Sequence, residues 1–193
     1  MSYKHDYWYV KNYYTSKERK LITNFIEKNH TEIEKKDTTA LDKNKVSKKN
    51  TKTLIIEWRK IKNIVGNLMS SIQHLNEQNF GYELYPFNDL ENCMLNIYDS
   101  KRKGSYDWHF DSSHSDMYDV KLTVLVNLSE KYTGGKFHIF HGDEYVVEEF
   151  EPGTLLLFKS NLNHKVSPVL TGVRKTLTLL INGREIKKPI YNY

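Results

Sequence analysis

The chain has little cysteine, proline and glycine, and it has no long apolar run. Its 193 residues include one Cys, four Pro and nine Gly. A single cysteine, Cys93, excludes an internal disulfide and a site made of several thiolates, so we expect it to be buried and unreactive. No stretch approaches the roughly 18 apolar residues of a membrane span, and the N-terminus MSYKHDYWYV lacks the apolar core of a secretion signal. We therefore expect a soluble, cytoplasmic protein with no membrane partner.

Positive charge is in excess only in the first third of the chain. Residues 1–60 hold 15 Lys and Arg against 8 Asp and Glu, whereas residues 61–193 hold 14 against 16. A basic surface can bind nucleic acid, but a lysine-rich surface is more often an ordinary solvated face. With 38% hydrophobic and 13% aromatic residues, the chain can form one domain with a full core.

Residues 1–81 show the pattern of a strand followed by helices. Tyr7–Tyr14 is aromatic and β-branched, which favours a strand, and Thr15 or Ser16 can cap a helix that runs to Asn29. Residues 35–52 hold seven lysines and almost nothing to bury, so we expect a flexible loop there. The segment LIIEW (54–58) suits a short strand or the start of a second helix that ends near Gly81. The apolar helical positions are Leu21, Ile22, Phe25 and Ile26 in the first helix, and Ile61, Ile64, Val65, Leu68, Met69, Ile72 and Leu75 in the second.

From Tyr82 onward the apolar period changes from about 3.6 to 2. The short runs are YELYPF, CMLNIYD, SYDWHFD, VKLTVLVNLS, GKFHIF, EYVVEEF, GTLLLF, NHKVSP and RKTLTLLIN. They predict a mainly β (α+β) protein whose core is a double-stranded β-helix, or jelly roll. We expect this core over residues 82–186, supported by the N-terminal strand and helices of residues 1–81 and followed by a tail, 187–193, all within one structural domain.

A histidine and an aspartate stand two residues apart in YDWHFD. Because side chains alternate along a strand, His109 and Asp111 should point to one face. Trp108 and Phe110 should point to the other face, and we expect Trp108 to pack in the core. His164 precedes the last long strand, and a jelly roll can bring it beside His109 and Asp111. Two histidines and one carboxylate form the facial triad that holds Fe(II) in non-haem oxygenases.

The last long strand, RKTLTLLIN, begins with an arginine ten residues after His164. Alternation places Arg174 and Thr178 on one face of this strand. A buried arginine beside a hydroxyl suits the far end of a dicarboxylate, because the guanidinium fork binds a carboxylate through two parallel hydrogen bonds.

The remaining histidines are not assigned to a metal. His138 and His141 are three residues apart near a strand end, where both rings seldom reach one ion, so we expect exposed or hydrogen-bonded rings. His114 and Asp116 repeat the HxD spacing, but they stand in the loop SSHSD, which has no apolar alternation.

Four segments together carry a family resemblance: HFD (109–111), YTGGKF (132–137), EPGTLLLF (151–158) and HKVSPVLTGVRKTLTLLI (164–181). They resemble the Fe(II)/2-oxoglutarate-dependent dioxygenases, specifically the prolyl 4-hydroxylase-like (PKHD-type) branch. The resemblance covers about residues 82–183, and the ordered set of motifs is more specific than any single one.

The resemblance implies roles for individual residues. His109, Asp111 and His164 would bind Fe(II), and Arg174 would pair with the C5 carboxylate of 2-oxoglutarate. Tyr98 stands where related enzymes have a tyrosine whose hydroxyl meets that carboxylate. Thr178 stands where a threonine faces the co-substrate.

One departure from the family pattern concerns the co-substrate site. Asn127 stands where many prolyl hydroxylases have a tyrosine near 2-oxoglutarate. We therefore assign Asn127 to this site and expect the contact to be altered, lost or supplied by another residue. Asp111 is retained, which favours hydroxylation over halogenation.

The implied reaction uses Fe(II), 2-oxoglutarate and O2, hydroxylates a C–H bond and releases succinate and CO2, with ascorbate as the reductant of oxidised iron. The favoured substrate is a peptidyl proline, and the 35–52 loop and the SKRKGS turn (100–105) are candidate walls of its groove. A small-molecule substrate stays open. A nucleic-acid substrate is disfavoured, because the second arginine of the nucleic-acid demethylases would fall at Leu180. A cupin-like binding module without enzymatic activity is the remaining alternative, and the oligomeric state is open.

Overall fold

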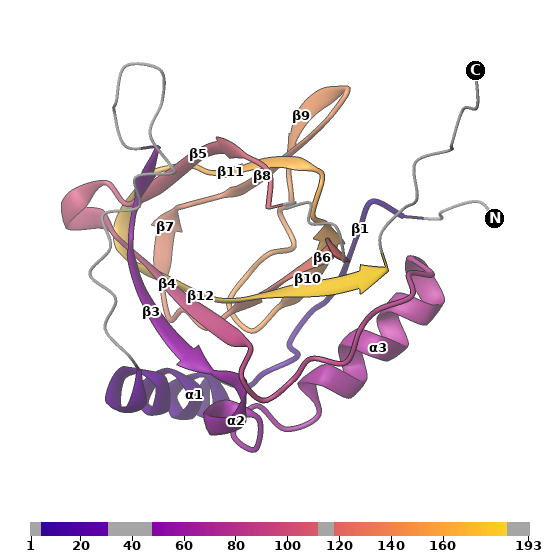
Figure 1. Cartoon of the computed structure of the whole chain (residues 1–193). Coiled ribbons are helices and arrows are strands. Elements are labelled where there is room, and N and C mark those ends of the chain that lie inside the picture. The colour runs from indigo at the N-terminus through magenta and orange to yellow at the C-terminus, as the bar shows by residue number, and fades with distance from the viewer. Residues whose placement is uncertain (1–4, 31–47, 112–117, 185–193) are drawn as a thin grey trace.

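Two β-sheets face each other, and the helices cover the outer side of the larger one (Figure 1). The computed structural model describes residues 5–30, 48–111 and 118–184. The larger sheet has the order β1-β10-β6-β12-β4-β3, with β7 also paired to β12, and the smaller sheet has the order β2-β5-β11-β8-β9. The arrangement is the jelly roll that the sequence predicts.

The strands of the larger sheet are β1 (Tyr7–Val10), β3 (Lys52–Glu57), β4 (Asn92–Asp99), β6 (Tyr118–Asn127), β7 (Tyr132–Gly134), β10 (Leu155–Lys159) and β12 (Val169–Arg184). Those of the smaller sheet are β2 (Lys49–Asn50), β5 (Ser105–His109), β8 (Phe137–His141), β9 (Asp143–Val146) and β11 (Asn163–Val166). The helices are α1 (Ser16–Asn29), α2 (Trp58–Ile61), α3 (Leu68–Asn79) and the 3-10 turn η2 (Ser100–Arg102).

Helix α1 begins and ends where the sequence predicts. Thr15 caps it, and the Thr15 and Glu18 side chains each bond the other residue's backbone N–H, which forms a capping box. Ile22 and Ile26 are buried against the sheet. Leu21 is 56% exposed, so its predicted place on the buried face is wrong. Only the side of α1 centred on Ile22 and Ile26 meets the sheet.

The second predicted helix is interrupted. LIIEW lies mostly in β3, which pairs with β4, and Trp58 starts the short helix α2. Gly66 then adopts a φ of +59°, a left-handed conformation that ends helical geometry before α3 starts at Leu68. Val65 and Leu68 are still buried, because the turn brings both apolar segments to the same face of the sheet. Periodicity alone could not distinguish one helix from two.

Two predicted strands differ from those of the structure. The N-terminal strand ends at Val10, not Tyr14, and Asn12 in the following turn has a positive φ. The YELYPF run is not a strand, because it pairs only through one bridge between Leu84 and Gly183.

The predicted loop 35–52 is too long at its C-terminal end. Lys49–Asn50 pairs with β5 and Lys52 starts β3, because backbone pairing with a neighbouring strand compensates for side chains that have little to bury. Residues 35–47, like His114 and Asp116, lie outside the residues that the structure describes.

Two apolar clusters lie on opposite faces of the larger sheet. On one face, residues of β6 such as Leu122 and Val124 pack under the three helices, together with Cys93. Burial raises the pKa of the Cys93 thiol to about 12, in agreement with an unreactive side chain. On the other face, Leu125 and Phe137 belong to a mainly aromatic cluster between the sheets. The polar residues discussed below share this inner space.

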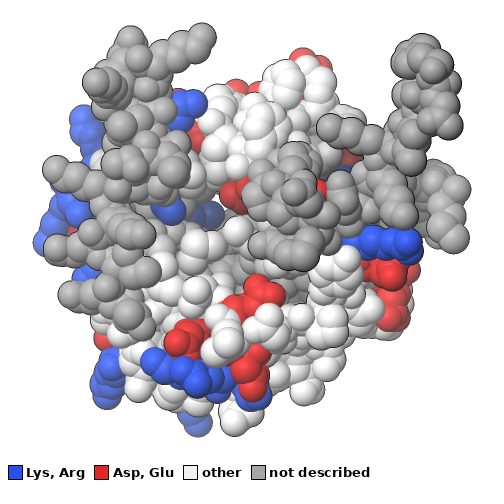
Figure 2. Space-filling view, in the orientation of Figure 1, with Lys and Arg blue, Asp and Glu red and all other residues white. Residues whose placement is uncertain are grey.

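In the orientation of Figure 2, basic side chains gather along the left edge, while acidic and basic side chains mix over the helical layer below. On this face the described residues form no continuous basic surface. No helix in the described part of the chain is long and apolar enough to cross a membrane.

Candidate metal centre

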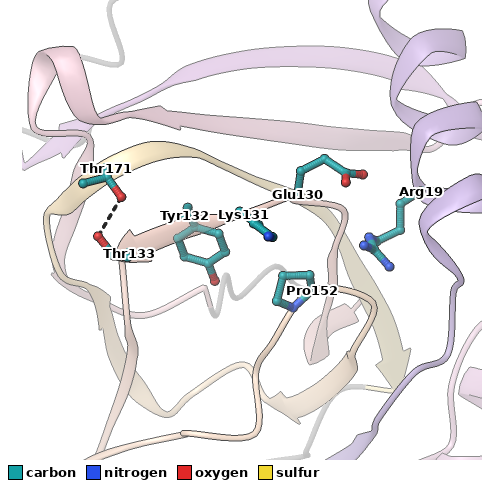
Figure 3. A pocket seen from close by; sticks show the side chains of 7 residues that line it. All are labelled: Arg19, Glu130, Lys131, Tyr132, Thr133, Pro152 and Thr171. Carbon is teal, nitrogen blue, oxygen red and sulfur yellow. Dashed lines mark hydrogen bonds between the residues drawn. The ribbon is translucent and has the colours of Figure 1, made fainter.

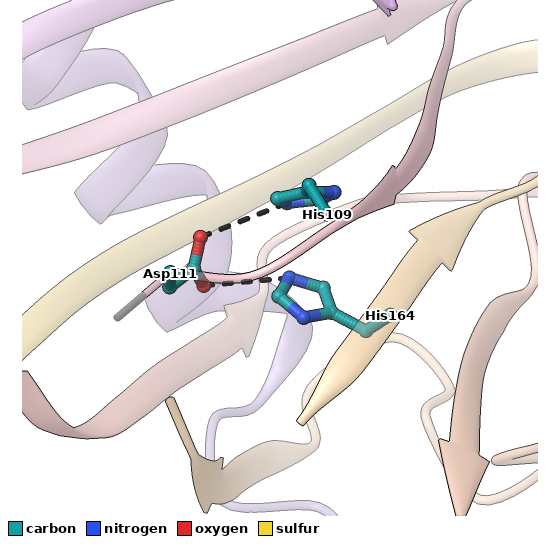
Figure 4. A group of neighbouring side chains, drawn as sticks. All are labelled: His109, Asp111 and His164. Carbon is teal, nitrogen blue, oxygen red and sulfur yellow. Dashed lines mark ion pairs between the residues drawn. The ribbon is translucent and has the colours of Figure 1, made fainter. Parts of the chain in front are cut away.

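His109, Asp111 and His164 come together as one cluster (Figure 4). His109 ends β5 and lies directly across from His164 on β11, because the two residues are register partners. Asp111 lies just beyond β5, where its backbone N–H donates to the Ser160 carbonyl. One ligand atom from each of the three residues lies within 4.8 Å of the other two. The carboxylate oxygens of Asp111 are 3.6 Å from His109 Nε2 and 3.4 Å from His164 Nε2.

Backbone carbonyls fix the orientation of both rings. His109 Nδ1 lies 2.7 Å from the Asp107 carbonyl oxygen, and His164 Nδ1 lies 2.9 Å from that of Leu162. A carbonyl only accepts, so each Nδ1 carries a hydrogen and each ring turns its Nε2 toward the centre. Two imidazole nitrogens and one carboxylate fit a divalent ion such as Fe(II).

A bulge in the pairing of β5 with β11 brings a second aromatic ring to the cluster. Tyr106 pairs with Val166 and His109 with His164, so β5 has one residue more than β11 between these pairs. Tyr106 therefore reaches the same side as His109 and stacks on it, with ring centroids 3.5 Å apart. Simple alternation misses this contact.

Trp108 points away from the cluster, as alternation predicts, but its predicted place in the core is wrong. It lies on the outer face of the smaller sheet, edge-on to Phe140, with Lys165 Nζ 4.6 Å from its ring centroid. None of the helices in the described ranges covers the outer face of this sheet, which accounts for the partial exposure of Trp108.

Thr123 connects the cluster to the larger sheet. Its hydroxyl donates to Asp111 Oδ2 at 2.9 Å and lies 3.1 Å from Ser160 Oγ. Burial alone would raise the pKa of the Asp111 carboxyl, but the hydrogen bond from His164 and the one that Thr123 donates oppose it, and the pKa is lowered. Asp111 is thus held as a carboxylate, the form that binds a metal.

The imidazole of His109 is held neutral. Burial, with the neighbouring His164 as a further contribution, lowers the pKa of His109 from 6.5 to about 4. A neutral imidazole is the form that can donate a lone pair to a metal.

Arg174 lies in the same inner space with no acidic partner among the described residues. Its side chain is 1% exposed, and its Nε and Nη2 have no hydrogen-bond acceptor. Its guanidinium carbon lies 5.1 Å from the ring centroid of Tyr98 and 5.3 Å from that of Phe150. Two neighbouring donors that point at no acceptor form an unfilled site for an anion.

Tyr98 and Gly135 shape the space around this guanidinium. Tyr98 is the register partner of Arg174, and burial raises the pKa of its hydroxyl to about 12, so the hydroxyl keeps its proton. A Cβ on Gly135 would lie 3.0 Å from Arg174 Cδ and 2.8 Å from Val169 Cγ2. Only glycine at position 135 therefore leaves room for the aliphatic part of the Arg174 side chain.

The other two predicted co-substrate residues already have protein partners. Thr178 accepts from Asn96 Nδ2 at 3.0 Å. Asn127 donates to the Tyr132 hydroxyl and to the Phe150 carbonyl, each at 3.0 Å, and its Oδ1 accepts from the Ser129 N–H at 3.1 Å.

Sequence reasoning gave no role to several residues of this inner space. Thr176 has a buried hydroxyl that finds no partner within the described part of the chain, and it lies on the same face as Arg174 and Thr178. The alternation along β12 that identified Arg174 also places Thr176 on this face, so the sequence held the signal for it. Thr123 likewise stands out as a polar residue in the apolar run VKLTVLV.

Two further expectations can be compared with the structure. His138 and His141 contact different carboxylates, Glu144 and Asp6, so their rings do not converge on one ion. The turn 100–105 precedes β5 and therefore lies at the opposite end of that strand from His109. It is not positioned as a wall beside the metal-binding cluster.

A family model matches the segment that carries this cluster. The model described as the 2OG-Fe(II) oxygenase superfamily matches residues 93–182, the segment that carries all seven predicted site residues. The matched segment, just under half of the chain, is similar to this superfamily. The match runs from the start of β4 nearly to the end of β12.

This chain is similar to a curated protein over part of its length. It is 36% identical over 73 residues to a PKHD-type hydroxylase from Synechococcus sp. (strain CC9605), a match that covers 36% of this chain and 33% of that protein. The aligned part thus spans about a third of the relative's length.

Solved structures show the same fold at lower identity. A prolyl-4-hydroxylase from Pseudomonas putida has a TM-score of 0.64 and 18% identity, with 95% of this chain and 94% of that chain covered. A prolyl hydroxylase from Trichoplax adhaerens, in complex with a peptide fragment of hypoxia inducible factor, has a TM-score of 0.64 and 17% identity, with 93% and 84% covered. The family match points to the 2-oxoglutarate-dependent iron dioxygenases, and the solved structures, at identities below 25%, show the shared fold.

Proposed function

We propose that this oxygenase hydroxylates a C–H bond of a peptidyl proline in a reaction that consumes 2-oxoglutarate and O2. The observation that carries the proposal is the buried guanidinium of Arg174, which has unused donors in the same inner space as a two-histidine, one-carboxylate cluster. A binding module that only held a metal would not need this arginine inside.

The metal role falls to His109, Asp111 and His164. When bound there, Fe(II) supplies the means to couple O2 and 2-oxoglutarate to C–H hydroxylation, with release of succinate and CO2. Backbone carbonyls orient both imidazoles through their Nδ1 hydrogens, burial holds His109 neutral, and the contacts with His164 and Thr123 keep Asp111 ionised. Ascorbate would serve as an external reductant for oxidised iron.

The co-substrate role falls to Arg174, supported by Tyr98, Thr176 and Thr178. Arg174 presents Nε and Nη2 side by side, which matches the two oxygens of the C5 carboxylate of 2-oxoglutarate. The protonated Tyr98 hydroxyl and the unpartnered Thr176 hydroxyl are further donors in this space. Aromatic rings around the guanidinium exclude water and strengthen the ion pair.

The peptide substrate is supported by the names of the relatives. A PKHD-type hydroxylase and prolyl hydroxylases, one of them with a bound peptide, are similar to this chain. A free amino acid or another metabolite is the second candidate class, because one fold serves many substrates.

The test is succinate release from 2-oxoglutarate with Fe(II) and ascorbate, compared between proline-containing peptides, free proline, methylated oligonucleotides and no substrate. We expect peptide-stimulated succinate and a one-oxygen mass gain on the peptide. If free proline or an oligonucleotide stimulated succinate release and the peptides did not, the proposal of a peptidyl substrate would be wrong. A complete lack of succinate would contradict the enzymatic proposal and favour a binding module.

Variants of the metal-binding cluster show whether the measured succinate comes from this protein or from a contaminating enzyme. His109→Ala and Asp111→Ala should abolish succinate release, because each removes one of three ligands. His141→Ala is the matched control, since this histidine is 61% exposed and pairs with Asp6. Activity retained in either cluster variant would refute the assignment of the triad.

A further inference from the structure

The hydroxyl of Tyr132 reaches the same buried space as Arg174. Tyr132 starts β7 and is the register partner of Gly172, two residues before Arg174. A Cβ on Gly135 would lie 3.4 Å from Tyr132 Cε2 and 3.0 Å from Arg174 Cδ, so the tyrosine ring and the arginine stem converge on this glycine. The hydroxyl itself contacts Asn127, which is 0% exposed.

Asn127 fixes which way the hydrogen bond to Tyr132 runs. Asn127 Oδ1 accepts from the backbone N–H of Ser129, which can only donate. The amide can therefore not be flipped, and its Nδ2 faces the Tyr132 hydroxyl and the Phe150 carbonyl. Asn127 thus donates to the Tyr132 oxygen, and both of its amide hydrogens are used.

The proton of the Tyr132 hydroxyl is consequently free to be donated elsewhere. The tyrosine oxygen accepts from Asn127, and no acceptor for its O–H is found among the described residues. Asn127 lies across from Thr176, on the strand face that also presents Arg174. The neighbouring guanidinium edge is likewise without an acceptor. One carboxylate has lone pairs enough for all these donors.

We infer that Tyr132, held by Asn127, donates a hydrogen bond to the carboxylate that Arg174 binds. The inference rests on the proposed function and adds a residue that the family pattern does not assign. It makes Asn127 a positioning residue rather than a direct ligand, and it makes Tyr132 the residue that supplies the contact expected at position 127.

Tyr132 also borders a pocket on the surface, and this decides which variant to use (Figure 3). The pocket has a volume of about 550 Å³. Its lining residues are Arg19, Glu130, Lys131, Tyr132, Thr133, Pro152 and Thr171. Because the Tyr132 ring contacts both the pocket and the space around Arg174, truncation to alanine would admit water to the guanidinium. Tyr132→Phe removes only the hydroxyl and keeps the ring.

The experiment compares two ligands by isothermal titration calorimetry on the Mn(II)-loaded protein without O2, so that no turnover occurs. One ligand is 2-oxoglutarate, and the other is 2-oxopentanoate, which has the same chain with a methyl group in place of the C5 carboxylate. Tyr132→Phe should weaken 2-oxoglutarate binding by about tenfold or more, since a hydrogen bond to a charged group is lost. Its affinity for 2-oxopentanoate should stay unchanged.

Two further variants complete the test. Tyr13→Phe is the matched control, because the Tyr13 hydroxyl donates to Ser71 in the helical layer, and it should bind both ligands like the parent protein. Asn127→Asp replaces the donor to Tyr132 by an acceptor that captures the tyrosine proton. It should therefore weaken 2-oxoglutarate binding selectively in protein that melts normally.

The outcomes distinguish the inference from the function on which it rests. If the parent protein prefers 2-oxoglutarate to 2-oxopentanoate and Tyr132→Phe keeps the full preference, the inference is wrong and the proposed function stands. If Tyr132→Phe weakens both ligands equally, the hydroxyl has only a structural role and the inference is again wrong. A parent protein with no preference would refute the co-substrate site itself.

Discussion

At the scale of single residues, the most costly feature of the ligand-free protein is the buried charge of Arg174. A buried cation without a counter-ion is destabilising, and replacement by an apolar side chain of similar length removes that cost. Arg174→Met should therefore raise the free energy of unfolding of the ligand-free protein by about 1–3 kcal/mol. It should also weaken 2-oxoglutarate binding at least tenfold. Urea unfolding and calorimetry measure the two effects.

The control for this variant is Arg184→Met on the same strand. Arg184 is exposed and contacts Glu83 at 3.4 Å, so its loss should change neither quantity by much. A less stable Arg174→Met protein would show that the guanidinium is compensated in the folded state. Unchanged affinity would remove Arg174 from the co-substrate site.

The lowered pKa of His109 predicts how the metal-free protein responds to acid. Between its ordinary value of 6.5 and about 4, the unfolded chain binds a proton at His109 that the folded protein does not. Stability therefore falls as the pH drops through this window, and the contribution of His109 is constant above it. As the pH falls below about 6.5, the urea midpoint of the parent protein should therefore fall relative to that of His109→Gln, which has no imidazole at this position.

Carboxylates also titrate in acid, so the difference between the two proteins is the informative quantity. Ser70→Ala on the exposed side of α3 removes no titratable group, so it should show a nearly constant difference across the same range. A pH-independent difference for His109→Gln would mean that burial does not lower the pKa of this imidazole.

At the scale of elements, the capping box of α1 predicts a change in stability that leaves the site untouched. Thr15→Ala removes the side-chain bond to the Glu18 N–H and should lower the free energy of unfolding by about 1 kcal/mol. Metal and 2-oxoglutarate affinity should not change, because α1 packs on the face of the sheet opposite to the site. Urea unfolding tests the first statement, with Ser70→Ala inside α3 as the control. A loss of affinity would show that the helical layer and the site are coupled.

Strand alternation predicted the site well where strands are regular and poorly where they are not. In β12 the period of two placed Arg174 and Thr178 correctly on one face. In β5 a bulge brought Tyr106 to the side of His109, and no sequence pattern marks such an extra residue. The helical period had the same limit at Gly66, since a helix and a helix–turn–helix can bury the same apolar positions.

At the scale of the whole molecule, ligands that bind only the folded state should stabilise it in a defined order. Mn(II) at about one hundred times its Kd adds about 2.7 kcal/mol, which for a chain of this size raises the Tm by roughly 5–10 °C. In the presence of Mn(II), 2-oxoglutarate should add a second increase. His109→Ala should lose both increases, and Arg174→Met only the second. A second increase that survives in Arg174→Met would place the co-substrate elsewhere.

The sequence predicted the architecture and the grouping of His109, Asp111 and His164, but not the hydrogen bond between Asn127 and Tyr132. The barrel and the triad follow from local period and motif order. This hydrogen bond depends on how the end of β6 lies against the Ser129 backbone, the Phe150 carbonyl and the start of β7. Such contacts arise from the packing of several loops, and the period of one strand contains no information about them.

The separation of the two apolar clusters has a consequence for how this protein can change in evolution. The helices contact only the outer face of the larger sheet, whereas every assigned site residue comes from the strands of the barrel or the residues beside them. The family match likewise covers residues 93–182, while the likeness of fold to the Pseudomonas putida enzyme covers 95% of the chain. The N-terminal layer can therefore change in sequence without contact with the inner site, provided that it keeps an apolar face toward the sheet.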